Sequence, residues 1–224
     1  QKKYVMHCMT RISQQECSGI LEKKILCQKL RSKEEGHKME SGKLLEVLKV
    51  AERLKDATRH CYTSGGRRES VAEHSWRITL MAYLVSDEFP EADFTKLLKM
   101  CLIHDLGEAF TGDIPTFEKT DSDEAKEAEF LSQWVSELPE PFAGEMLYKE
   151  MEERQTLEAR IYKALDNLEA LIQHNESDIS TWIPLEYDLQ MTYGNDKVQF
   201  SEYLMELRDR VRNDSIAKID AANR

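Results

Sequence analysis

The stretch of sequence that decides the fold covers residues 98–115 and reads LKMCLIHDLGEAFTGDIP. Apolar residues repeat at helical spacing in its first half, which predicts a buried helix over about residues 93–106. The helix is expected to end in the adjacent pair His104-Asp105. Imidazole and carboxylate groups are rarely buried without a partner, so this pair indicates that a charged group is held at the end of the helix.

Two more carboxylates follow this pair. Glu108 comes four residues after His104 and shares its helical face if the helix continues through Gly107. Asp113 follows in a Thr-Gly-Asp-Ile-Pro segment, where an aspartate can also serve only to build an Asx turn. Four ionisable groups thus lie within ten residues, and we interpret the stretch as half of a metal-dependent active site.

Length and composition indicate an ordinary globular protein. The chain has 224 residues, of which 41% are hydrophobic and 33% are charged, and this suffices for one well-buried domain. Its apolar runs are far too short for a membrane span, and no apolar segment with a cleavage site marks a signal peptide. The five cysteines form no CxxC pair, which favours reduced thiols. We therefore expect a cytoplasmic protein with no membrane partner.

The net charge of −11 is unevenly distributed. Residues 1–38 contain nine Lys and Arg against four Glu, whereas the rest of the chain has 22 basic and 38 acidic residues. Such an acidic body argues against a nucleic-acid partner. It also means that a phosphate ester needs a cation and local arginines to bind. Because residues 1–38 are basic and poorly patterned, we predict a loosely ordered extension there and the folded domain over residues 39–224.

Hydrophobic periodicity predicts an all-α fold. The sequence shows no sustained period-two alternation and no tandem repeat. Ser70 and Glu73 form a capping box that predicts the start of one helix. Residues 56–69 are expected to form a polar loop, and residues 177–199 are expected to be irregular. Helices are predicted over about residues 41–55, 70–88, 93–106, 122–137, 141–153, 156–174 and 199–220.

Two isolated residues complete the pattern. His74 lies in the first turn of the helix that Ser70 caps, where a lone histidine is most often a satisfied core or surface residue. Asp166 lies in the helix predicted over residues 156–174, where an aspartate usually faces solvent. Here it borders the apolar stripe, and a carboxylate at that boundary needs a partner or an ion.

His74, the pair His104-Asp105 and Asp166 resemble the H…HD…D signature of the HD-domain phosphohydrolase superfamily. Their surroundings are similar to those of one branch, the HD-domain 5′-deoxynucleotidases, and the similarity extends over about residues 42–211. A lone HD dipeptide is a weak signal, whereas four blocks in the right order are a specific one. The matching blocks are SVAEH at 70–74, HDLGE at 104–108, TGDIP at 111–115 and ALDNLEAL at 164–171.

The resemblance implies a single HD-domain bundle of about six to eight helices. It also implies one metal ion, with His74, His104, Asp105 and Asp166 as its ligands. Two imidazoles and two carboxylates suit a divalent ion such as Mn²⁺, Co²⁺, Fe²⁺ or Zn²⁺ better than Ca²⁺. Such an ion lowers the pKa of bound water and neutralises the charge that develops on a phosphoryl group.

The resemblance further implies catalytic roles for Glu108 and Asp113. One assignment has Glu108 positioning or deprotonating the attacking water and Asp113 protonating the leaving 5′-oxygen. Paired carboxylates titrate as a unit, so the opposite assignment stays open.

Basic residues near the site are candidates for binding the substrate. Arg59 matches a family arginine that contacts substrate, and His60 follows it where the deoxynucleotidases carry a tryptophan packed near the sugar. Imidazole offers less apolar surface and an additional donor, so we expect rejection of a 2′-hydroxyl to be relaxed. Arg67 and Arg68 approach a helix N-terminus, which attracts anions, although they can equally belong to a solvated loop. Lys119 is a weaker candidate of the same kind.

These expectations combine into one hypothesis: a cytosolic HD-domain 5′-nucleotidase that hydrolyses (deoxy)ribonucleoside 5′-monophosphates. A homodimer is implied by the resemblance alone. One alternative is an HD phosphohydrolase that acts on a triphosphate, a cyclic dinucleotide or guanosine tetraphosphate. Another is a non-catalytic nucleotide-binding module, but a module that only binds has no need of Glu108 and Asp113.

Overall fold

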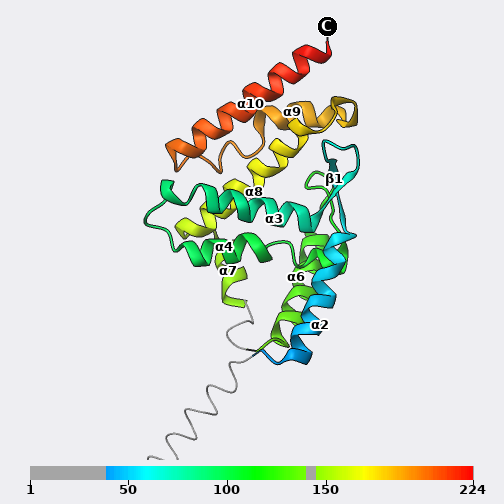
Figure 1. Ribbon diagram of the computed structural model, residues 1–224, viewed down its shortest axis with the longest axis vertical. Helices are drawn as coiled ribbons and strands as arrows, with labels where there is room; N and C mark the ends of the chain where they lie inside the picture. The colour runs from blue at the N-terminus through cyan, green and yellow to red at the C-terminus, as the bar shows by residue number, and fades with distance from the viewer. Residues whose placement is uncertain (1–38, 140–144, 224) are drawn as a thin grey trace, which may run out of the picture.

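The computed structural model describes residues 39–139 and 145–223, and helices dominate it (Figure 1). The all-α prediction is confirmed, apart from one small hairpin. The extension predicted over residues 1–38 lies outside the described residues. In the described part of the chain, no helix combines the length and the apolar composition needed to cross a membrane. The elements in chain order are α2 (Ser41–Glu52), η1 (Arg53–Lys55), β1 (Thr58–Tyr62), β2 (Arg68–Ser70), α3 (Val71–Leu84), η2 (Ser86–Glu88), α4 (Phe94–Ile103), α5 (Glu108–Thr111), α6 (Asp121–Ser136), α7 (Glu145–Glu153), α8 (Leu157–Glu176), η3 (Ile179–Thr181), α9 (Pro184–Thr192) and α10 (Glu202–Ala222).

Helix α8 lies at the centre of the fold, and α3, α4 and α10 pack around it (Figure 1). Its apolar stripe of Ile161, Leu165 and Leu168 is at most 1% exposed. Burying one such side chain stabilises the folded chain by about 1.5–3 kcal/mol. The core therefore fixes the helices relative to one another. Polar side chains from different helices can then meet at the edge of the core. The residues that other helices contribute to this core include Ile78, Ala82, Leu97, Met100 and Leu204.

Helix α4 is shorter than the sequence predicts. It ends at Ile103, and residues 104–107 form turns before α5 begins at Glu108. Glycine is favoured at position 107 because a Cβ atom there would lie 2.7 Å from Glu127 Cγ of α6. The helix does not continue through Gly107, so Glu108 starts a separate helix and does not share the helical face of His104.

Helix α3 begins with the predicted capping box. The backbone N–H of Glu73 donates to Ser70 Oγ (3.3 Å), and the backbone N–H of Ser70 donates to Glu73 Oε2 (2.9 Å). A cap of this kind stabilises a helix by about 1 kcal/mol. It also sets where the helix begins, which places His74 on the buried face of the first turn.

A short hairpin occupies the segment that the sequence predicts as a polar loop. Strands β1 and β2 run antiparallel and pair Thr58 with Ser70 and Tyr62 with Arg68, with an irregularity in between. So short and irregular a pair shows no alternating pattern, and tertiary contacts stabilise it instead. The side chain of Gln173 on α8 donates to the backbone carbonyl of Tyr62 (2.7 Å). The hairpin thereby lays β1 against α8.

Helix α9 lies within residues 177–199, which the sequence predicts to be irregular. It begins at Pro184, and proline is well tolerated in the first helical turn because the N–H of that position has no helical partner. Glu186 accepts a hydrogen bond from the backbone N–H of Ile183, the residue just before the helix (2.7 Å). The proline that indicated a turn therefore starts a helix.

Candidate active site

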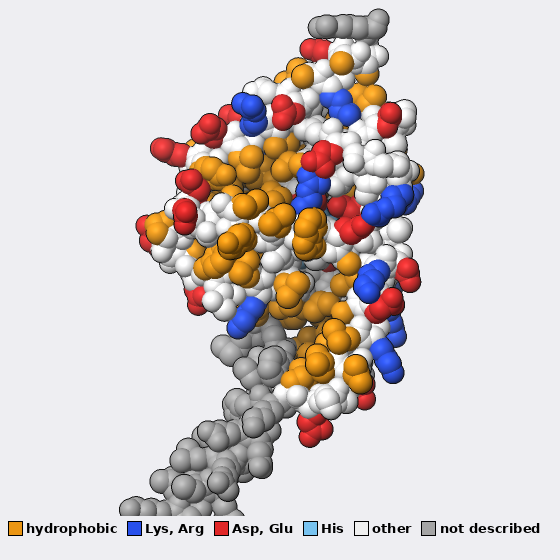
Figure 2. Space-filling model, in the orientation of Figure 1, with side chains coloured by type: hydrophobic (Ala, Val, Ile, Leu, Met, Phe, Trp, Pro, Cys, Tyr) orange, Lys and Arg blue, Asp and Glu red, His pale blue; other side chains and the backbone are white. Residues whose placement is uncertain are grey.

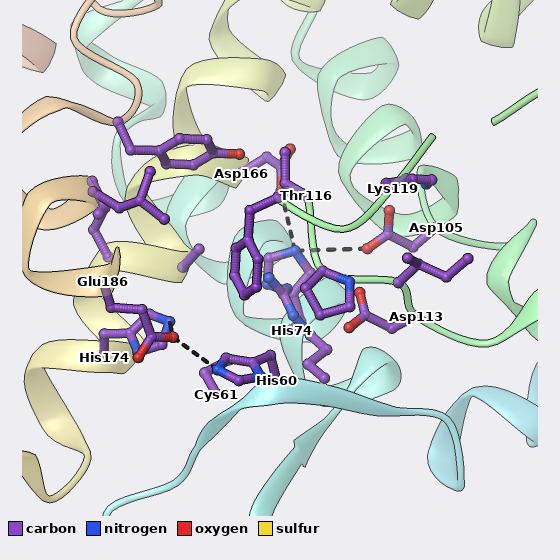
Figure 3. Close-up of a pocket in the computed structure, with 18 of the residues that line it drawn as sticks. His60, Cys61, His74, Asp105, Asp113, Thr116, Lys119, Asp166, His174 and Glu186 are labelled. Carbon is purple, nitrogen blue, oxygen red and sulfur yellow. Dashed lines mark hydrogen bonds and ion pairs between the residues drawn. The ribbon is translucent and has the colours of Figure 1, made fainter. Parts of the chain in front are cut away.

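Four side chains from three segments converge beside the core, and we name them the central group. Figure 3 labels three of them, His74, Asp105 and Asp166. His74 comes from α3, Asp166 from α8, and His104 with Asp105 from the turn after α4. His74 Nε2 lies 3.2 Å from Asp166 Oδ1 and 3.7 Å from Asp105 Oδ2. His104 Nε2 lies 2.9 Å from Asp105 Oδ2 and 3.9 Å from Asp166 Oδ1. The residues that the sequence singled out are thus together.

Both histidines of the central group are held through their second ring nitrogen. Glu169, one turn after Asp166, contacts His74 Nδ1, and His104 Nδ1 donates to the backbone carbonyl of Cys101 (3.0 Å). A ring that donates through Nδ1 keeps its lone pair on Nε2 when it is neutral. Nε2 of each ring faces the carboxylates of the central group. This is how a metal-ligating histidine is usually oriented.

The central group attracts positive charge. Burial and the charge of Arg59 lower the pKa of His74, but contacts with Asp166 and Glu169 outweigh them and raise it to about 9. The buried carboxylates therefore hold a proton on an imidazole that would otherwise lose it near neutral pH. A metal ion would compete with this proton for the ring nitrogen of His74.

The donor atoms of the central group fit a divalent metal ion. His74, His104 and Asp166 each offer a ligand atom within 4.8 Å of the other two, and Asp105 adds a second carboxylate near both rings. His104 Nε2 is buried, and among the described residues it has no aligned hydrogen-bond partner. Two nitrogen and two oxygen donors match a borderline first-row ion better than Ca²⁺.

A second cluster beside His74 is better explained as an ion-pair network. Glu69, His74 and Glu169 also offer ligand atoms within 4.8 Å of one another. However, Arg59 Nε lies 3.7 Å from Glu69 Oε2, and Arg59 Nη1 lies 3.9 Å from Glu169 Oε2. Arg77 Nε lies 3.7 Å from the other oxygen of Glu169. These guanidinium groups already offset both carboxylates, so the cluster positions His74 rather than an ion.

Glu108 and Asp113 line the same cavity as Asp105. Glu108 is 6% exposed, and its Oε2 has no hydrogen-bond partner within the described residues. Burial, helped by the charges of Asp105 and Asp113, raises the pKa of Glu108 to about 10. Burial also raises the pKa of Asp113. Both carboxyl groups hold a proton more readily than free side chains, and either can exchange one with a ligand in the cavity.

Three cationic side chains also line the cavity: Arg59, Lys119 and Lys163. The sequence analysis named the first two but missed Lys163. Its Nζ lies 2.6 Å from Asp166 Oδ2. The available signal was its position three residues before Asp166 on one face of a helix.

Arg67 and Arg68 do not line this cavity. Arg67 is mostly exposed and pairs with Glu73, and Arg68 lies over the ring of Tyr62, 5.5 Å from its centroid. The alternative of a solvated basic loop therefore describes both arginines better than phosphate binding.

His60, His174 and Glu186 form a second polar cluster in the cavity, which we name the distal group. In Figure 3 Glu186 and His174 lie on the opposite side of the pocket from Asp105 and Asp113, and His60 lies between them. Glu186 Oε1 lies 3.0 Å from His60 Nε2 and 3.3 Å from His174 Nε2. The sequence analysis named only His60, because nothing local indicates that α8 and α9 bring the other two residues to it. The apolar residues that line the cavity are Ile114, Pro115, Phe117, Ala170, Leu171 and Leu189.

The sequence matches the family described as HD domain over residues 51–208. The match spans more than half of the chain and includes every residue of the central group. The chain therefore belongs to the HD-domain family.

The chain is also similar to named relatives and to a solved structure. The 5′-deoxynucleotidase HDDC2 of Homo sapiens is 31% identical over 139 residues, which cover 59% of this chain and 67% of the human protein. Its counterpart of the same name in Dictyostelium discoideum is 30% identical over 146 residues, which cover 59% of this chain and 76% of the relative. A solved structure from Magnetospirillum magnetotacticum, described as a "Predicted metal-dependent phosphohydrolase", has a TM-score of 0.65 and 27% identity, over 78% of this chain and 94% of that one.

Proposed function

We propose that the chain is a metal-dependent phosphomonoesterase that hydrolyses nucleoside 5′-monophosphates, with deoxyribose or ribose, to nucleoside and phosphate. The observation that carries this proposal is the central group, of which His74, Asp105 and Asp166 line one cavity with the carboxyl groups of Glu108 and Asp113. Relatives that are named 5′-deoxynucleotidase support both the reaction and the class of substrate.

The central group would hold one divalent transition-metal ion, such as Mn²⁺, Co²⁺, Fe²⁺ or Zn²⁺. His74 and His104 would contribute Nε2, and Asp105 and Asp166 would contribute carboxylate oxygens. When bound, such an ion lowers the pKa of a water molecule and offsets the negative charge of a phosphate.

Arg59, Lys119 and Lys163 would bind the phosphate dianion. Each of them also lies near a carboxylate. Lys119 Nζ lies 2.7 Å from Glu127 and Lys163 Nζ lies 2.6 Å from Asp166. Arg59 lies near Glu69 and Glu169, as described above. These pairs fix the positions of the ammonium groups before substrate arrives. Together the three cations offset the repulsion that a chain of net charge −11 exerts on a phosphate ester.

Glu108 and Asp113 would move the protons. In our assignment Glu108 positions the attacking water and takes a proton from it once the charge of a bound metal ion has lowered the raised pKa of Glu108. Asp113 gives a proton to the 5′-oxygen as the P–O bond breaks. In an aryl phosphate such as p-nitrophenyl phosphate, the leaving group is a stable phenolate that departs without a proton. The variant that lacks the acid should therefore retain more of its activity on the aryl phosphate than on dAMP, and this comparison separates the two possible assignments.

The substrate sugar would lie near His60, which lines the cavity next to Arg59 in β1. The small imidazole leaves room where an indole would exclude a 2′-hydroxyl. We therefore include ribonucleotides in the proposed substrate class.

A homodimer would form through the exposed face of α3. Trp76, Tyr83 and Leu84 are 63%, 62% and 70% exposed. Leu80 on the same helix and Leu102 on α4 are 38% and 59% exposed. Figure 2 shows hydrophobic side chains gathered over α3 and α4. Monomers rarely expose so continuous an apolar surface. Light scattering measures the mass in solution, and a charged residue at Tyr83 should reduce it to that of a monomer.

We also place the chain in the cytosol. Cys61 and Cys101 are free thiols in the described part of the chain, and both are buried. Unpaired cysteines are typical of reducing compartments.

A screen that measures both released phosphate and the nucleotide products tests the proposed function, because hydrolysis of the alternative substrates need not release free phosphate. The full chain is loaded with each of the four metals and given dAMP, AMP, dATP, a cyclic dinucleotide and guanosine tetraphosphate. Release of phosphate from dAMP and AMP, lost in Asp105→Asn, is the expected result. Hydrolysis of dATP, of the cyclic dinucleotide or of guanosine tetraphosphate instead would assign a different HD phosphohydrolase. Binding of nucleotides without turnover would identify a non-catalytic module.

A further inference from the structure

Glu186 of the distal group has no part in the phosphate chemistry described above. It is 2% exposed, and burying a carboxylate is costly unless its oxygens find partners. Oε2 accepts from the backbone N–H of Ile183, but Oε1 has no aligned donor among the residues that the structure describes. Two imidazole nitrogens lie beside Oε1, at 3.0 and 3.3 Å. The fold thus keeps a carboxylate next to two rings that reach the cavity.

The ring of His174 can offer a hydrogen-bond acceptor to this cavity. The side chains of His60 and His174 are 25% and 17% exposed, and both line the cavity in front of Glu186. Burial and the neighbouring His60 and Arg59 lower the pKa of His174 to about 4, so its ring is neutral at neutral pH. When Nε2–H of a neutral ring faces Glu186, Nδ1 keeps its lone pair for a ligand. A ligand that carries N–H donors suits this arrangement.

Helix α8 sets the distance between the central group and the distal group. Asp166 and His174 are eight residues apart on this helix, which corresponds to about 12 Å along its axis. Ala170 and Leu171 line the cavity on the intervening turns. The sugar of a nucleotide is joined directly to its phosphate and stays near the central group. The base lies beyond the sugar and is the part that reaches the distal group.

We propose that the distal group recognises the amino group on the edge of a nucleobase, so that the chain favours adenine and cytosine over uracil and thymine. This inference rests on the proposed function, because the phosphate at the central group sets the position of the base. His174 contacts the base, and Glu186 is a positioning residue that acts through its ring. A carbonyl oxygen in place of the amino group faces the acceptor nitrogen of His174, which leaves both polar groups unpaired.

The pair dCMP and dUMP tests this proposal, since the two bases match in size and differ in an amino group against a carbonyl. The full chain, loaded with metal, is assayed for kcat/KM on both substrates. We expect at least about a tenfold preference for dCMP, the effect of one hydrogen bond that is made or left unpaired. His174→Ala and Glu186→Gln should each reduce that preference to about threefold or less, with both proteins folded by circular dichroism.

Glu158→Gln is the matched control. Glu158 is 7% exposed and accepts from the backbone N–H of Asp93 (2.6 Å), as Glu186 does from Ile183, but it does not line the cavity. This variant should keep the preference of the wild type. If Glu186→Gln fails to fold, His174→Ala decides the question, because its side chain is only partly buried.

Four results would overturn the proposal. Equal turnover of dCMP and dUMP by the wild type, or an unchanged preference in His174→Ala, refutes base recognition while the proposed function stands. A shift of the AMP to dAMP ratio in His174→Ala, without a shift of the dCMP to dUMP ratio, would show that the ring meets the sugar. Absence of phosphate release from every monophosphate would remove the proposed function, and this inference with it.

Discussion

Glu169→Gln tests how the central group is held in place. Glu169 is fully buried on α8, where it contacts His74 Nδ1. It also lies 3.9 Å from Arg59 Nη1 and 3.7 Å from Arg77 Nε. Glutamine keeps the volume of the side chain but removes its charge. His74 then loses the charged partner that strengthens the basicity of Nε2.

The structure sets the size of two effects. Loss of the partner of a ligating histidine lowers metal affinity by about 10- to 100-fold, which equals about 1.4–2.7 kcal/mol. Removing one charge from a buried ion-pair network destabilises a fold by about 3–5 kcal/mol. Arg77 keeps its contact with Glu176 (2.6 Å) after the change, so we expect a loss of stability near about 3 kcal/mol, the lower end of that range.

Isothermal titration of the metal-free chain with MnCl₂ measures the affinity, and urea unfolding measures the stability. Glu176→Gln is the matched control, because Glu176 lies on the same helix and pairs with Arg77 but is exposed and does not contact His74. The control should bind metal as the wild type does. Wild-type metal affinity in a folded Glu169→Gln protein would refute the reasoning, and so would an equal loss of affinity in both variants.

Three other substitutions test the site and its support. Burial raises the pKa of Glu108 to about 10, so the folded metal-free chain keeps a proton that the unfolded chain releases above 4.5, and stability falls as the pH rises between these values. Glu108→Gln should flatten that dependence in thermal melts, and an unchanged slope would contradict the shift. Gly107→Ala should lower Tm in calorimetry by about 2–4 °C, because a Cβ atom 2.7 Å from Glu127 Cγ displaces that side chain, and an unchanged Tm would count against the close approach. His60→Trp should raise the dAMP to AMP ratio of kcat/KM by about tenfold, and a constant ratio would show that this side chain does not meet the sugar.

Local patterning predicts most of the helices, because each has its own apolar stripe and several have their own caps. The stripe of α8 and the capping box of α3 are properties of consecutive residues, and the structure confirms both. Local patterning does not predict the hairpin, because a contact from Gln173 on α8 stabilises it. It does not predict helix α9 either, because Pro184 is equally suited to a turn and to a first helical turn.

The candidate site divides in the same way. His74, His104, Asp105 and Asp166 follow from the sequence, because each lies in a block whose order resembles a known family. That they meet is a property of the packed core, which joins α3, α4 and α8. Glu169 stands three residues after Asp166 in the sequence, yet only the fold turns it toward His74.

By itself, the sequence determined the class of fold and the residues able to form a metal site. Only the tertiary structure decided that His174 and Glu186 join His60, that Lys163 faces the cavity, and that Arg67 and Arg68 do not. The physical reason is the separation along the chain over which each interaction acts. Helical periodicity and capping act over a few neighbouring residues, whereas the side chains that share a cavity depend on how α8 packs against β1, α3 and the segment that contains α9.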